Sequence, residues 1–123
     1  MLVAAFIVLG MVVLLGCALA VLHLRNDGAR TPPWPLVALH GLLAIVGLCC
    51  LALALRGPPR GLAQGMASFG IIATVLITLC ALAGAGLLAA HILKKRIPGL
   101  VIGIHATLAV SGLVILAAYV LAG

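Results

Sequence analysis

Four long apolar runs constrain the fold of this chain more than any other feature. They cover residues 2–24, 34–55, 65–93 and 98–122. Each exceeds the roughly 20 residues that a helix needs to cross the hydrocarbon core of a bilayer. The 123-residue chain is 67% hydrophobic and 7% charged, which is more apolar surface than a soluble domain of this size can bury. The pattern predicts an all-α integral membrane protein, an up-down four-helix bundle forming one domain, residues 1–123.

The basic residues indicate how the bundle is oriented. Five of the seven Lys and Arg side chains follow the first or the third run: Arg25, Arg30, Lys94, Lys95 and Arg96. The middle connection holds the other two. By the positive-inside rule, the first and third connections lie in the cytoplasm, and the termini and the middle connection lie outside. We therefore expect a multi-pass protein of the inner (cytoplasmic) membrane, in contact with the lipid bilayer.

The chain also contains an internal repeat. The segment 40–48, HGLLAIVGL, aligns without a gap with 105–113, HATLAVSGL. The first and third runs align in the same way, Gly16 with Gly84 and His23 with His91. This predicts two similar helical hairpins, 1–56 and 61–123. Both hairpins run in the same direction across the membrane, which does not fit an inverted-repeat transporter.

Each apolar run contains one histidine, with a glycine seven residues away toward the membrane interior. The four pairs are His23 with Gly16, His40 with Gly47, His91 with Gly84, and His105 with Gly112. Seven residues span almost two helical turns, which places each glycine about 10 Å from its histidine on nearly the same face. An imidazole above a side-chain-free surface could hold one edge of a flat macrocycle. Because of the repeat, only two of these matches are independent, and glycine also serves close helix packing in membranes.

The depth of the histidines is the stronger argument for a site. All four lie beside the first or the third connection, and therefore on one side of the membrane. Ionisable residues inside membrane segments are costly and are functional candidates. The second and fourth helices of an up-down bundle are diagonal partners, so His40 and His105 are the preferred ligand pair. His23 and His91 are the second choice. The alternatives are interfacial side chains for this second pair and a simple interhelical hydrogen bond for the first.

The group that best fits these residues is haem b with two axial imidazoles. We expect one haem, with two side by side as an alternative that a homo-oligomer would accommodate. The predicted lining of the haem slot is Gly16, Gly47, Gly84 and Gly112. The predicted cations near the haem propionates are Arg25, Arg30, Lys94, Lys95 and Arg96. A quinone head group beside His23 and His91 is a further alternative.

With four apolar spans and intramembrane histidines such as His40 and His105, the chain resembles the bacterial four-helix membrane b-type cytochromes, broadly the cytochrome b561-like proteins. The resemblance implies electron exchange with quinone or with a redox partner protein at one membrane surface. It implies an electron carrier or cytochrome subunit rather than a stand-alone enzyme. Proteins of that kind commonly ligate one haem toward each face, whereas the histidines here lie toward one face only. This departure argues against a haem-to-haem path across the membrane.

Two other classes of function remain as alternatives. A small four-span transporter or channel would fit the size, but such exporters generally need a carboxylate inside the membrane. The sole acidic residue, Asp27, lies in a connection. A structural membrane anchor for a cytoplasmic partner would explain the basic connections, which could dock the partner or bind anionic lipid. The anchor reading leaves the histidines unexplained.

Other chemistries find less support in the sequence. Zinc or copper would need further ligands, and no thiol is expected at the depth of the histidines. The four cysteines contain no C-x-x-C and are interpreted as small buried hydrophobes: Cys17, Cys49, Cys50 and Cys80. The chain offers no nucleophile–base pair, phosphate-binding loop or paired carboxylates. No nucleic-acid partner is expected.

Overall fold

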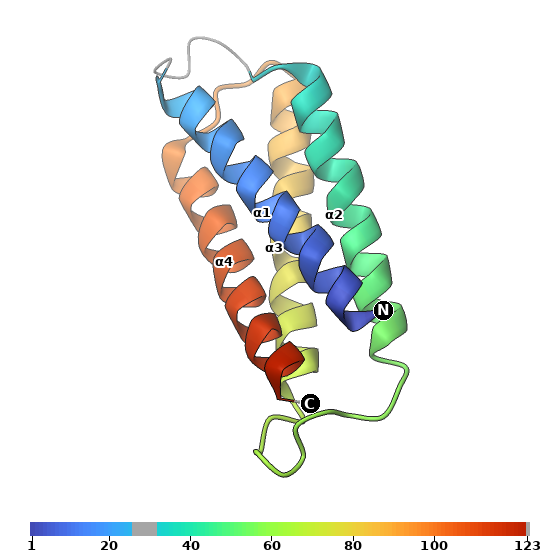
Figure 1. The fold of residues 1–123 in the computed structure, drawn as a ribbon. Coiled ribbons are helices and arrows are strands. Elements are labelled where there is room, and N and C mark those ends of the chain that lie inside the picture. The colour runs from blue at the N-terminus through green and yellow to red at the C-terminus, as the bar shows by residue number, and fades with distance from the viewer. Residues whose placement is uncertain (26–31, 123) are drawn as a thin grey trace.

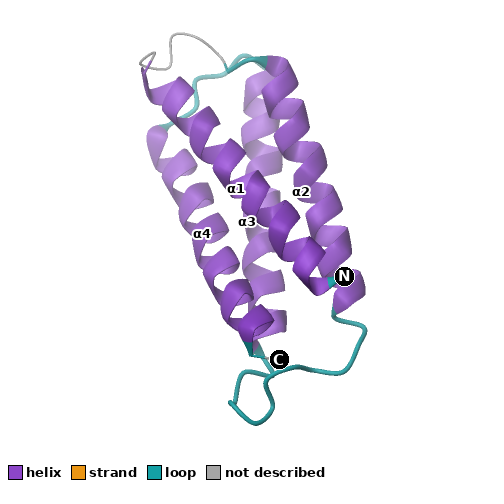
Figure 2. Ribbon diagram, viewed as in Figure 1, coloured by secondary structure: helices purple, strands orange, loops and turns teal. Residues whose placement is uncertain are grey.

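The computed structural model of this chain describes residues 1–25 and 32–122. This part of the chain forms four helices that run alternately up and down (Figure 1): α1 (Leu2–Arg25), α2 (Trp34–Ala54), α3 (Phe69–Ile92) and α4 (Gly99–Leu121). Figure 2 shows the described chain as almost entirely helical, with loops at the connections. The predicted all-α, up-down bundle is confirmed.

The third helix begins later than its apolar run predicts. Helix was expected from residue 65, but α3 begins at Phe69. Gly61 and Gly65 both have φ of +69°, in the left-handed region that glycine adopts without strain. The chain turns there, and the Met66 N–H donates to the Gly61 carbonyl at 2.8 Å. The right-handed helix therefore starts only after these two glycines.

The end of α3 is closed by a Schellman motif. The Lys94 N–H donates to the His91 carbonyl at 3.2 Å, and the Lys95 N–H donates to the Ala90 carbonyl at 2.9 Å. Lys94 takes the left-handed position with φ of 51°. The motif places the exposed side chains of residues 94–96 at the C-terminal end of α3, where the helix dipole favours positive charge.

The helices match a bilayer in length and in the nature of their outer surface. They contain 21 to 24 residues, or roughly 32 to 36 Å at 1.5 Å per residue, against a hydrocarbon core of about 30 Å. Large aliphatic side chains point outward, such as Leu14, which is 72% exposed, and Leu100, which is 75% exposed. The described residues include no buried charged or polar side chain. The chain is a multi-pass membrane protein whose apolar surface faces lipid.

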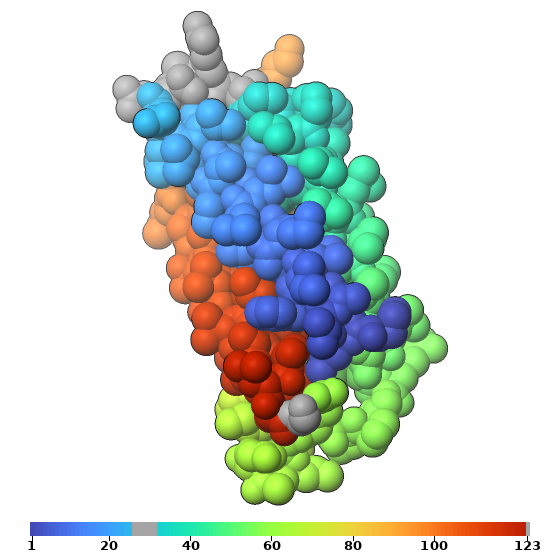
Figure 3. Space-filling model, viewed as in Figure 1, coloured from blue at the N-terminus to red at the C-terminus, as the bar shows by residue number. Residues whose placement is uncertain are grey.

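The bundle is built from two tightly packed hairpins. The helices contact one another most extensively within each hairpin, α1 with α2 and α3 with α4. Contacts between the hairpins are fewer, and α2 with α3 is the least extensive pair. The space-filling view shows α1 and α4 meeting along one face (Figure 3). Across the diagonals, α1 with α3 and α2 with α4, the described backbones make no close approach.

The two hairpins bury equivalent positions. Each buried residue below is given first for the first hairpin and then for the second. The buried pairs are Ala5 and Ala73, Leu9 and Ile77, Val12 and Cys80, Gly47 and Gly112, and Leu51 and Leu116. A Cβ atom at Gly47 would lie 2.7 Å from Cδ2 of Leu9, and one at Gly112 would lie 2.8 Å from Cγ1 of Ile77. These glycines therefore let the two helices of each hairpin approach closely, in the same way in both halves.

Candidate cofactor site

His40 and His105 lie beside each other between the two hairpins, toward the end of the bundle where α2 and α4 begin. Their ring centroids lie 6.2 Å apart with an interplanar angle of 68°. They come from the diagonal helices α2 and α4, and each lies six residues after the first residue of its helix. That spacing places both about 9 Å from the helix start, at 1.5 Å per residue. The structure thus brings together the two histidines that the sequence places on diagonal helices.

Both rings are held by the same kind of hydrogen bond. Nδ1 of His40 donates to the Val12 carbonyl at 3.1 Å, and Nδ1 of His105 donates to the Cys80 carbonyl at 3.0 Å. A carbonyl oxygen only accepts, so Nδ1 carries the hydrogen in each neutral ring and Nε2 keeps its lone pair. Metal-ligating histidines almost always make such a second hydrogen bond, which fixes the tautomer and the ring orientation.

Gly16 and Gly84 give the imidazoles access to those carbonyls. Each glycine lies one helical turn after the residue whose carbonyl accepts the bond. A Cβ atom at Gly16 would lie 3.0 Å from Cε1 of His40, and one at Gly84 would lie 3.0 Å from Cε1 of His105. Each glycine therefore makes room for the imidazole of the neighbouring helix in its hairpin. It also lies seven residues from the histidine of its own helix.

The four glycines predicted to line a slot are all covered by side chains. The imidazoles cover Gly16 and Gly84, while Leu9 covers Gly47 and Ile77 covers Gly112. All four contacts lie within a hairpin, so none of these glycines provides an open surface. The rings of His40 and His105 are partly buried and lie edge-on to each other across the boundary between the hairpins.

Cys80 corrects the expectation that no thiol lies at the depth of the histidines. Its Sγ lies 3.4 Å from Nδ1 of His105, and its thiol donates to the His105 carbonyl at 3.5 Å. The interpretation of all four cysteines as buried was also wrong, because Cys17 and Cys49 are exposed and Cys50 is only partly buried. The register between two helices, which a single apolar run does not reveal, decides that Cys80 contacts His105.

The other two histidines lie away from this pair, in the last turns of α1 and α3. The ring of His91 stacks on Trp34, with centroids 5.7 Å apart and an interplanar angle of 14°. His23 is partly buried two residues before the end of α1. Within residues 1–25 and 32–122, no three His, Cys or acidic side chains gather as a metal site. A centre made of all four histidines is therefore not formed.

The basic residues lie at the end of the bundle nearest the histidines. Arg25 ends α1, and Lys94, Lys95 and Arg96 follow α3; all four are exposed. Arg30, also predicted to lie near the propionates, and the sole acidic residue fall outside the described residues. Figure 1 shows the last turns of α1 and α3 at one end of the bundle, and the start of α1 and the last turn of α4 at the other. The charge asymmetry of the sequence therefore corresponds to one end of the bundle.

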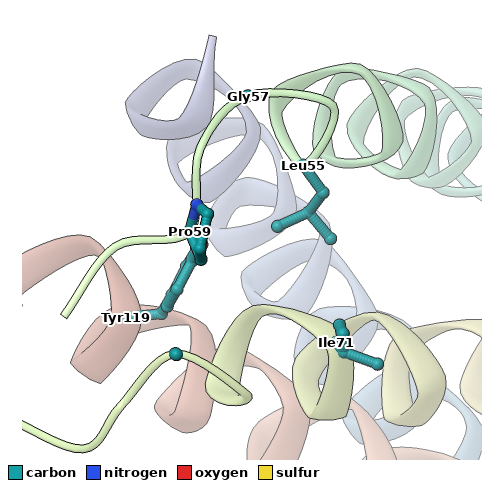
Figure 4. A pocket seen from close by; sticks show the side chains of 6 residues that line it. Leu55, Gly57, Pro59, Ile71 and Tyr119 are labelled. Carbon is teal, nitrogen blue, oxygen red and sulfur yellow. The ribbon is translucent and has the colours of Figure 1, made fainter. Parts of the chain in front are cut away.

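A small pocket lies at the opposite end, between the α2–α3 connection and the end of α4 (Figure 4). Its volume is about 110 Å³. Its lining residues are Leu55, Gly57, Pro59, Ala67, Ile71 and Tyr119. The Arg60 N–H donates to the Tyr119 hydroxyl at 3.2 Å, which ties the connection to α4. The pocket has no histidine in its lining and is far too small for a macrocycle, so the central histidine pair is the better candidate site.

No family model, curated protein or solved structure matches the chain. The resemblance to membrane b-type cytochromes therefore stays a prediction from the apolar spans and the histidines, and the functional case depends on the geometry of His40 and His105.

Proposed function

We propose that this chain is a membrane b-type cytochrome that binds one haem b through His40 and His105. The observation that carries the proposal is the pair of diagonal imidazoles, each with Nδ1 bound to a carbonyl and Nε2 available as a ligand. The ring centroids lie 6.2 Å apart, and the two imidazoles would hold the iron of a single haem.

The origin of the two ligands also supports the proposal. His40 belongs to the first hairpin and His105 to the second, so a group that they share joins the two halves of the chain. The hairpins pack against each other less extensively than the helices do within each hairpin. The boundary between the hairpins is thus the part of the bundle best able to admit a ligand, and we expect haem to stabilise the bundle by binding there.

When bound, haem b supplies reversible one-electron transfer between ferric and ferrous iron. The residues of the chain orient the ligands and set the surroundings. The carbonyls of Val12 and Cys80 fix the imidazole tautomers. Arg25 and residues 94–96 provide positive charge at the nearer end, where anionic propionates are favourably placed.

The same charge distribution predicts the orientation of the protein in the membrane and the side on which it meets its electron-transfer partner. By the positive-inside rule, the end with Arg25 and residues 94–96 faces the cytoplasm, in an inner membrane with both termini outside. The central histidines lie nearer this end, so the electron partner is a quinone or a redox protein that meets the chain on this side. One haem fits better than two, because the stacking of His91 on Trp34 occupies one of the two remaining rings.

The test is the visible spectrum of the purified protein after expression with an adequate haem supply. We expect a Soret band and sharp α and β bands on reduction. All three bands should be lost in His40→Ala and in His105→Ala. The matched control is His91→Ala. This variant removes a partly buried histidine from the hairpin that also contains His105, and it should keep the bands. A colourless wild-type protein would refute the proposal, and loss of pigment only in His23→Ala or His91→Ala would reassign the ligands.

A further inference from the structure

The hydrogen bonds and glycine contacts of His40 and His105 follow one pattern and differ in the residue that supplies the carbonyl. Each ring donates Nδ1–H to a carbonyl of the preceding helix, and each ring covers a glycine one turn farther along that helix. The residue that supplies the carbonyl is Val12 in the first hairpin and Cys80 in the second. This exchange of an aliphatic side chain for a thiol gives the two histidines chemically different neighbours.

The thiol of Cys80 reaches the imidazole directly. Its Sγ lies 3.4 Å from Nδ1 and 4.0 Å from Nε2 of His105. The thiol hydrogen is directed to the backbone carbonyl of His105, 3.5 Å away, which leaves the sulfur lone pairs to face the ring. The Nδ1–H of His105 therefore lies between two acceptors of one residue, the carbonyl oxygen and the sulfur. The corresponding position beside His40 is an aliphatic side chain that cannot accept a hydrogen bond.

We propose that Cys80 is a positioning residue for His105. The sulfur of Cys80 is a second acceptor for the Nδ1–H of His105, and this contact makes the two central imidazoles inequivalent. Its consequence for electron transfer rests on the function proposed above. A stronger acceptor at Nδ1 makes the imidazole a better electron donor through Nε2. Better donation favours ferric over ferrous iron, and second-shell hydrogen bonds of this kind tune haem potentials. Cys80 thus lowers the reduction potential relative to a site with valine in both hairpins.

The competing explanation is that Cys80 only fills space in the core. Its side chain is 8% exposed, and free cysteine often behaves as a small hydrophobe. Two substitutions separate volume from hydrogen bonding. Cys80→Val copies the residue that the first hairpin already carries at the equivalent position, so the bundle should tolerate it. Cys80→Ser keeps a donor and an acceptor in nearly the same place. Cys49→Val, in an exposed cysteine of α2, is the matched control.

The first measurement uses the protein without haem. The ring nitrogens of 15N-histidine-labelled protein in lipid nanodiscs report the hydrogen bond at Nδ1 directly. Cys80→Val should shift the His105 ring resonances and leave those of His40 in place, Cys80→Ser should restore most of the shift, and Cys49→Val should have no effect. The reciprocal Val12→Cys should shift the His40 resonances instead. Unchanged His105 resonances in Cys80→Val would overturn the proposal.

The second measurement is the reduction potential of the haem-loaded protein. The potential should rise in Cys80→Val, return toward the wild-type value in Cys80→Ser, and stay unchanged in Cys49→Val. A potential that rises equally in Cys80→Val and Cys80→Ser would also overturn the proposal, because volume and not hydrogen bonding would then be responsible. If the wild type binds no haem, the proposed function fails, whereas the ring resonances of the haem-free protein still decide the role of Cys80.

Discussion

A methyl group at Gly16 tests the geometry that holds His40. The added Cβ of Gly16→Ala would lie 3.0 Å from Cε1 of the imidazole, whereas ordinary contacts begin near 3.4 Å. The ring must therefore retreat by about 0.4 Å, which stretches its bond to the Val12 carbonyl from 3.1 Å to the outer limit for a hydrogen bond, about 3.5 Å. We expect a displaced ligand and a weakened hydrogen bond.

The change in stability has two opposing parts. Loss of such a hydrogen bond costs about 0.5–1.5 kcal/mol, and replacing glycine by alanine inside a helix gains about 0.5–1 kcal/mol. The two contributions nearly cancel in Gly16→Ala. Gly10, on the same helix, has nothing within 4 Å of an added Cβ, so Gly10→Ala keeps the whole gain. The free energies of unfolding of the two variants should therefore differ by about 1 kcal/mol.

The assay is equilibrium unfolding in mixed micelles followed by circular dichroism, with the visible spectrum of the haem-loaded protein recorded in parallel. Gly16→Ala should weaken or broaden the reduced α band, and Gly10→Ala should leave it unchanged. The same comparison applies in the second hairpin to Gly84→Ala and Gly86→Ala, because an added Cβ at Gly86 meets nothing within 4 Å. The reasoning is refuted if Gly16→Ala is as stabilising as Gly10→Ala and the spectrum is unaltered.

Three further predictions concern parts of the bundle outside the ligand pair. Lys94→Gly should stabilise the protein by about 1 kcal/mol, because Lys94 has φ of 51°; lower stability in chemical unfolding would contradict this. Gly112→Ala should destabilise the protein by about 1–3 kcal/mol, because the added Cβ would lie 2.8 Å from Ile77. Gly103→Ala is the control and should not destabilise the protein, because its added Cβ meets nothing within 4 Å. Equal stability of the two variants would refute close packing at Gly112. Tyr119→Phe should cost about 0.5–1.5 kcal/mol by removing the acceptor for the Arg60 N–H, and its haem spectrum should match the wild type.

The sequence predicts the bundle well because hydropathy and length determine it. The apolar runs locate the helices to within a few residues, and short connections require antiparallel neighbours, which makes α2 and α4 diagonal. The exception is the start of α3, where Gly61 and Gly65 adopt positive φ. The apolar character of this segment continues through the turn, so hydropathy alone extends the helix too far.

The contacts of the site are less predictable, because they depend on the register between helices. The spacing along one helix associates Gly16 with His23, whereas in space an added Cβ at Gly16 would meet the ring of His40. The contact between Cys80 and His105 joins residues of two helices and is invisible in either apolar run. The internal repeat offers a partial signal, since Cys80 and Val12 occupy equivalent places one turn before Gly84 and Gly16.

The central claim is that His40 and His105 together bind one haem. It is tested most directly by the haem-to-protein ratio of the purified chain, measured with the electron paramagnetic resonance spectrum of the oxidised form. The account predicts one haem per chain with a low-spin, bis-histidine signal that disappears in either His40→Ala or His105→Ala. A protein that contains no haem, or a low-spin signal that survives in both variants, would contradict it.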